Sequence, residues 1–113
     1  MALGTVDSGT HTCVITTPAD LESTTTAGIY VCQYNLLNAV KGDVFRLYAT
    51  TKVLTGDTEA IVFEGIFAND LNDSTIIQSP PIVSMFSLSM MIEQTDGTGR
   101  NVPWSLVRIA EFA

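Results

Sequence analysis

The stretch that decides the fold is residues 44–68, VFRLYATTKVLTGDTEAIVFEGIFA. Apolar and polar side chains alternate along its first half, where Phe45, Leu47 and Ala49 share one face. A turn signal, Thr55-Gly56-Asp57, follows, and the second half is again rich in β-branched and aromatic residues. The pattern predicts a hairpin of two long strands at residues 44–54 and 58–68.

Short strand-like runs continue on both sides of this hairpin, separated by turn signals such as Asp7-Ser8-Gly9. Residues 18–27 are polar and rich in threonine, which predicts a loop, and no window favours more than one helical turn. Pro80-Pro81 places its flanking runs at a sheet edge or a corner. The further strands are predicted at residues 2–6, 11–16, 28–36, 75–78, 82–83, 86–94 and 102–110.

About eight strands at near-regular spacing are typical of an all-β fold. We therefore predict a single-domain antiparallel β-sandwich, jelly-roll-like, over residues 1–113, because that length suits one domain with one core. The apolar opening stretch, residues 1–9, is interpreted as an N-terminal arm that adds a strand to a neighbour.

The charge pattern excludes several partners. The net charge is -7, and the five basic residues are scattered, so we expect no nucleic-acid or anionic-membrane binding. There is no apolar run of about 18 residues and no signal peptide, which predicts synthesis in a cytoplasm. Charged residues make up only 15% of the chain, which favours burial of part of the surface against protein.

The sequence offers little catalytic chemistry. His11 is the single histidine and has no neighbouring carboxylate, so we predict no catalytic residues and no enzyme activity. Residues 70–74 resemble a calcium loop only faintly, and an irregular calcium site there stays an alternative to a solvated turn. No cofactor or metal site is predicted, and Cys13 and Cys32 are expected to be buried thiols rather than a disulfide.

Four residues are candidates for contact with a partner protein. Leu3 and Val6 belong to the apolar arm, and Arg100 lies in the glycine-rich turn before the last strand. Trp104 follows Pro103 and is either a core residue or an interface anchor.

Three stretches resemble a family of small virion proteins from tailed bacteriophages. They are Met1-Ala2-Leu3-Gly4-Thr5 to Ser8-Gly9-Thr10, Lys41-Gly42-Asp43 to Lys52-Val53-Leu54-Thr55-Gly56, and Gln94-Thr95-Asp96-Gly97-Thr98-Gly99-Arg100 to Pro103-Trp104. The resemblance runs in order through most of the chain, with strand-like segments between its parts.

The resemblance implies a structural protein of the virion. Similar small β-sandwich proteins serve as capsid cement or decoration proteins, so it implies binding to the major capsid protein on the outer capsid surface. A homo-oligomer, dimer or trimer, is expected because it multiplies the contacts per site. Two alternatives stay open: a tail or head–tail connector component, and a carbohydrate-binding module with Tyr30, Tyr34, Tyr48 and Trp104 as its aromatic platform.

Overall fold

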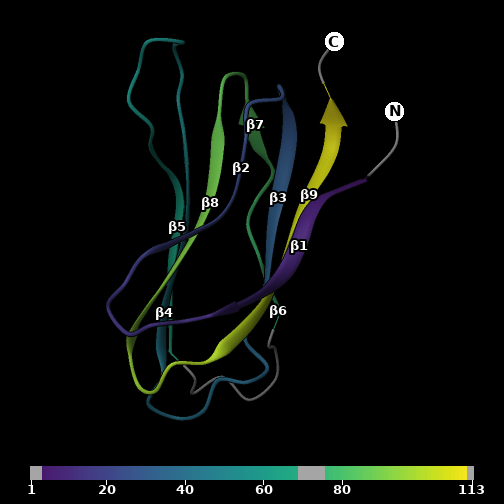
Figure 1. Cartoon of the computed structure of the whole chain (residues 1–113). Helices are drawn as coiled ribbons and strands as arrows, with labels where there is room; N and C mark the ends of the chain where they lie inside the picture. The colour runs from purple at the N-terminus through teal and green to yellow at the C-terminus, as the bar shows by residue number, and fades with distance from the viewer. Residues whose placement is uncertain (1–3, 69–75, 112–113) are drawn as a thin grey trace.

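The computed structural model describes residues 4–68 and 76–111, and within them it is a sandwich of two antiparallel sheets with no helix (Figure 1). Leu3 and the faint calcium loop after Asn69 lie outside the described residues. The strands are β1 (Gly4–Thr12), β2 (Ala19–Thr24), β3 (Gly28–Asn35), β4 (Val44–Thr51), β5 (Ala60–Ala68), β6 (Ile76–Gln78), β7 (Ile82–Ser84), β8 (Leu88–Asp96) and β9 (Asn101–Glu111).

The strand order confirms the jelly-roll prediction. One sheet has the order β1-β9-β3-β6, with β7 also paired to β3, and the other has the order β2-β8-β4-β5. The pairs β1 with β9, β2 with β8, β3 with β6 and β7, and β4 with β5 are nested, as in one long hairpin. That hairpin is then rolled so that β9 meets β3 and β8 meets β4, which is the double-sheet jelly roll.

The hairpin of residues 44–68 forms as predicted, with β5 at the edge of the second sheet and β4 next to it. In Figure 1 these two strands form the long teal hairpin whose turn lies at the upper end of the molecule. β4 begins beside Asp43, so its turn lies eight strand residues away, about 27 Å at roughly 3.4 Å per residue.

Two predictions for the first third of the chain were wrong. The turn expected at Asp7-Ser8-Gly9 is the middle of β1, which pairs with β9 on both sides of a register shift between Thr5 and Asp7. The loop expected at residues 18–27 contains β2, which pairs with β8. Both strands are sheet edges, where polar side chains replace the apolar alternation that marks a buried strand.

The prolines divide one strand of the jelly roll into two. β6 and β7 both pair with β3, and Pro80-Pro81 lies between them at the sheet edge, as predicted. Ser79 keeps this edge closed, since its N–H donates to the Cys32 carbonyl and its hydroxyl accepts from the Cys32 N–H, both at 2.9 Å.

The core lies between the sheets. β3 alternates strictly, with Tyr30, Cys32 and Tyr34 buried against side chains of β4, β8 and β9. The Tyr34 hydroxyl donates to the Met91 carbonyl at 2.9 Å, so one sheet is hydrogen-bonded to the other through the core. Cys13 and Cys32 are free buried thiols, and burial raises the pKa of each to about 11.

Candidate interaction surface at the β4–β5 hairpin tip

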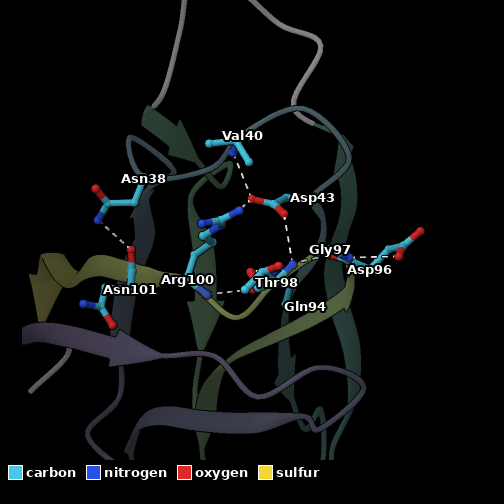
Figure 2. A network of polar contacts seen from close by, with 9 residues as sticks. All are labelled: Asn38, Val40, Asp43, Gln94, Asp96, Gly97, Thr98, Arg100 and Asn101. Atoms are coloured by element: carbon cyan, nitrogen blue, oxygen red, sulfur yellow. Dashed lines mark hydrogen bonds and ion pairs between the residues drawn. The ribbon is translucent and has the colours of Figure 1, made fainter.

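A polar network closes the end of the sandwich that lies opposite the hairpin turn (Figure 2). The Asp43 side chain is 1% exposed, and one carboxylate oxygen accepts from Arg100 Nε and from the Val40 N–H, both at 2.8 Å. The other oxygen accepts from the Thr98 N–H at 3.3 Å. The loop after β3 is thereby joined to the turn between β8 and β9.

Gln94 organises that turn from inside the protein. Its side chain is fully buried, and its amide nitrogen donates to the carbonyls of Thr98 at 2.7 Å and of Asp96 at 3.1 Å. Its amide oxygen accepts from the Arg100 N–H at 3.1 Å. We call Asp43, Gln94, Thr98 and Arg100 the clasp.

The charge of Asp43 is maintained by its partners. Burial alone raises the pKa of this carboxyl, but the Val40 and Thr98 N–H groups and the Arg100 guanidinium lower it by more, and the net shift is downward. The clasp is therefore a permanent ion pair with added N–H donors. Its residues belong to two of the three stretches that carry the phage resemblance, and they fasten loops rather than face an open site.

The opposite end of the sandwich, the turn of the β4–β5 hairpin, carries exposed apolar side chains. Val53 is 80% exposed and Leu54 is 64% exposed, and we call these two residues the tip. Asp57 holds them in place, because its N–H donates to the Leu54 carbonyl and its carboxylate accepts from the Leu54 N–H, both at 3.0 Å. The turn therefore has the backbone hydrogen bond of a β-turn from Leu54 to Asp57, and the Asp57 carboxylate adds a second bond across it.

Glu59 supports the base of the tip. Its carboxylate accepts from Ser87 Oγ at 2.7 Å, from Ser89 Oγ at 3.0 Å and from Thr50 Oγ1 at 3.2 Å. The residue that precedes β5 is thus joined by side chains to β4 and to the start of β8. A polar hollow of about 540 Å³ lies beside this cluster, and Lys52 and Asp57 are among the residues that line it.

We expect Asp57→Ala to loosen the tip without unfolding the protein. The variant removes the acceptor of the Leu54 N–H at an exposed turn, so the free energy of unfolding should fall by only about 0.5–1 kcal/mol. Hydrogen exchange of the Leu54 amide should become roughly two- to fivefold faster. The Leu47 amide in the middle of β4 is the internal control, and equal acceleration at both positions would contradict a local role.

The structure places the other sequence candidates in packing roles. Val6 on β1 and Trp104 on β9 are partly buried and pack against the core, and the Trp104 ring covers the backbone of Gly9. Trp104 also lines a small apolar hollow of about 220 Å³ with Pro103 and Ile76. Arg100 belongs to the clasp, with 28% of its side chain exposed.

Sequence reasoning missed the tip because it extended the first hairpin strand to Leu54, whereas β4 ends at Thr51. The signal that identifies the tip is the apolar pair Val53-Leu54 placed directly before the turn Thr55-Gly56-Asp57. Turns are usually polar, so apolar residues there favour a contact function.

Within residues 4–68 and 76–111 there is no cluster of His, Cys, Asp or Glu arranged to hold a metal ion, and no helix that could span a membrane. Comparison of the chain with protein-family models, with curated proteins and with solved structures finds no match.

Proposed function

We propose that this chain is a structural protein of a tailed-bacteriophage virion, a cement or decoration protein that binds the major capsid protein on the outer surface of the shell and stabilises it. Three features support the proposal. The sequence resembles small virion proteins, the fold is a stiff double-sheet jelly roll, and few charged residues oppose burial of the surface against protein.

The exposed apolar tip is the observation that carries this proposal. Val53 and Leu54 are large, exposed, and fixed by the Asp57 turn before any partner arrives. Burying an exposed Val or Leu side chain contributes about 1.5–3 kcal/mol, and a preordered loop loses little entropy on binding. The tip therefore suits insertion into an apolar pocket of a partner protein.

The burial of the tyrosines disfavours the carbohydrate-binding alternative. Tyr30 and Tyr34 are at most 1% exposed and Tyr48 is 7% exposed, so their rings are not available as a stacking platform. The remaining alternative, a tail or connector component, is separated from a capsid component by imaging labelled protein on virions.

The test measures binding of purified protein to capsids of the phage that encodes it. We expect the double variant Val53→Asp with Leu54→Asp to bind at least about 100-fold more weakly, because two apolar contacts are lost and two carboxylates are desolvated. The matched control is Leu37→Asp, a leucine that is 53% exposed in the loop at the clasp end. Its binding should be unchanged.

Unchanged thermal melting confirms that the tip variant is folded. Equal binding of the tip variant and the wild type would exclude the tip as the docking site. Failure of the wild type to bind capsids, together with its absence from virions by mass spectrometry, would exclude the proposed function itself.

A further inference from the structure

The outer edges of the two sheets differ in how well they are protected against pairing with another strand. β1 has a register shift and two glycines, β2 has a register shift and carries Asp20 and Glu22, and β6 and β7 are only three residues each with two prolines between them. Bulges, charges, prolines and short strands are the usual devices that protect an edge.

β5 has a bulge at Val62 but lacks most of the other devices. It is nine residues long, contains no proline and no basic residue, and its single carboxylate is Glu64. Ile61 and Val62 are each 48% exposed and Ile66 is 65% exposed. Among the residues that the structure describes, only β4 pairs with β5, so one edge of a long apolar strand is unpaired.

The charges near this edge are already compensated. Glu64 is paired with Arg46 of β4, and Arg46 also lies 3.6 Å from Glu93 of β8. A strand can therefore approach β5 without meeting an isolated charge, and no basic side chain on β5 selects for an acidic partner. An apolar, nearly neutral strand of the same composition fits this edge, and every copy of the chain supplies one.

From this we infer that β5 pairs antiparallel with β5 of a second copy across a two-fold axis, which gives an eight-stranded sheet in the dimer. Such pairing uses the same surface on both copies and closes as a dimer, which leaves no β5 edge unpaired. The inference concerns the chain alone and goes beyond the proposed function, so it does not depend on capsid binding.

The available area is sufficient for a weak specific dimer. β5 is about 30 Å long at roughly 3.4 Å per residue, and the thinnest dimension of the molecule is 19 Å. This side therefore offers about 500 Å² per copy, or about 1,000 Å² in total, at the lower limit for a specific interface. We expect a dissociation constant on the order of 10 µM.

Of the registers centred on Phe63, Glu64 and Gly65, the sequence of β5 favours the last. In a pair with a two-fold axis normal to the sheet, one residue of β5 must face the same residue of the other copy across the axis. If that residue is Glu64, two carboxylates lie opposite each other. Centring it on Phe63 would place Val62, which has no partner on β4, inside the new ladder. Centring it on Gly65 avoids the opposed carboxylates, moves Val62 to the end of the ladder opposite Ala68, and places Ile66 of one copy opposite Glu64 of the other.

This register predicts which charge at residue 66 weakens the dimer more. Ile66 faces Arg46 within one copy, so we expect the Ile66→Glu monomer to be more stable to unfolding than the Ile66→Lys monomer. For dimer stability the preference is opposite, because the two-fold axis creates two contacts between residue 66 of one copy and Glu64 of the other. We expect the Ile66→Glu dimer to dissociate roughly tenfold more readily than the Ile66→Lys dimer.

Sedimentation velocity between about 1 and 500 µM tests the inference, since that range brackets the expected constant. The control is Val14→Glu, which introduces the same charge at a 63% exposed valine in the loop after β1. Its dimerisation should match the wild type. A wild-type chain that stays monomeric throughout the range overturns the inference. So does a dimer that Val14→Glu weakens as much as Ile66→Glu does. A dimer in which Ile66→Lys is the weaker variant overturns the Gly65 register.

Discussion

Replacing Gly97 with alanine is expected to lower the free energy of unfolding by about 4 kcal/mol, a large part of the roughly 5–15 kcal/mol available to a small domain. Gly97 has a φ of +96°, which an L side chain adopts only with strain. A Cβ atom there would lie 2.0 Å from Asp43 Oδ1, so the turn has to move away from the clasp. Urea denaturation with unchanged slope measures the loss.

Two other glycines separate the contributions to this effect. Gly42 has a φ of +99° but has no atom within 4 Å of an added Cβ, so Gly42→Ala should cost only about 1 kcal/mol of backbone strain. Gly56 has neither a positive φ nor a close neighbour, and Gly56→Ala should leave stability unchanged. Equal losses for Gly97→Ala and Gly42→Ala would contradict a role for packing against Asp43.

Removing the Asp43 side chain should not rescue the Gly97 variant. An added Cβ at position 97 also lies 2.9 Å from the Asp43 Cα, which every residue at position 43 retains. The double variant Gly97→Ala with Asp43→Ala should therefore be no more stable than Gly97→Ala alone, by the same denaturation measurement.

The fold could be predicted from sequence where side-chain alternation reports burial. β3 and the inner face of β4 are buried on alternate residues, and the sequence shows this directly. The edge strands β1 and β2 could not be predicted in the same way. Their pairing is determined by β9 and β8, whose paired residues lie 64 to 104 positions further along the chain.

The clasp and the tip were hidden for different reasons. The glycine-rich turn was correctly predicted as a turn before the last strand, but its partner Asp43 precedes Arg100 by 57 positions. No local pattern pairs those two residues. The tip was hidden because Val53 and Leu54 continue the apolar composition of a strand that ends at Thr51.

The two ends of the sandwich thus have different roles. At the clasp end the polar groups hydrogen-bond to one another, and at the tip end apolar side chains are exposed to solvent. In the proposed β5 dimer the strands run antiparallel, so the two tips point in opposite directions.

Asp43→Ala is expected to lower the free energy of unfolding by about 3 kcal/mol near neutral pH. It leaves the Arg100 guanidinium and the N–H groups of Val40 and Thr98 without their acceptor. Arg100→Ala should cost a similar amount, because it leaves a buried carboxylate with only two N–H donors. The double variant should cost less than the sum of the single variants by about 1–2 kcal/mol, since both remove one interaction.

The pH dependence of stability distinguishes this ion pair from simple packing. The pKa of Asp43 is lower in the folded chain than its value of about 3.9 in an unfolded one. Its stabilisation is therefore complete above about pH 4 and is lost as the pH falls through the lower folded pKa. In Asp43→Ala the free energy of unfolding should fall less steeply below about pH 4. A fall as steep as in the wild type would contradict a stabilising role for the Asp43 charge.

Glu22 gives the opposite dependence and serves as the internal comparison. Burial and the neighbouring carboxylate of Asp7 raise its pKa in the folded chain, so the folded state binds this proton more readily than the unfolded state. Protonation of Glu22 should therefore stabilise the protein as the pH falls towards about 4.3, the unfolded value. Glu22→Gln should flatten the stability curve above that pH and leave the Asp43 limb below it intact.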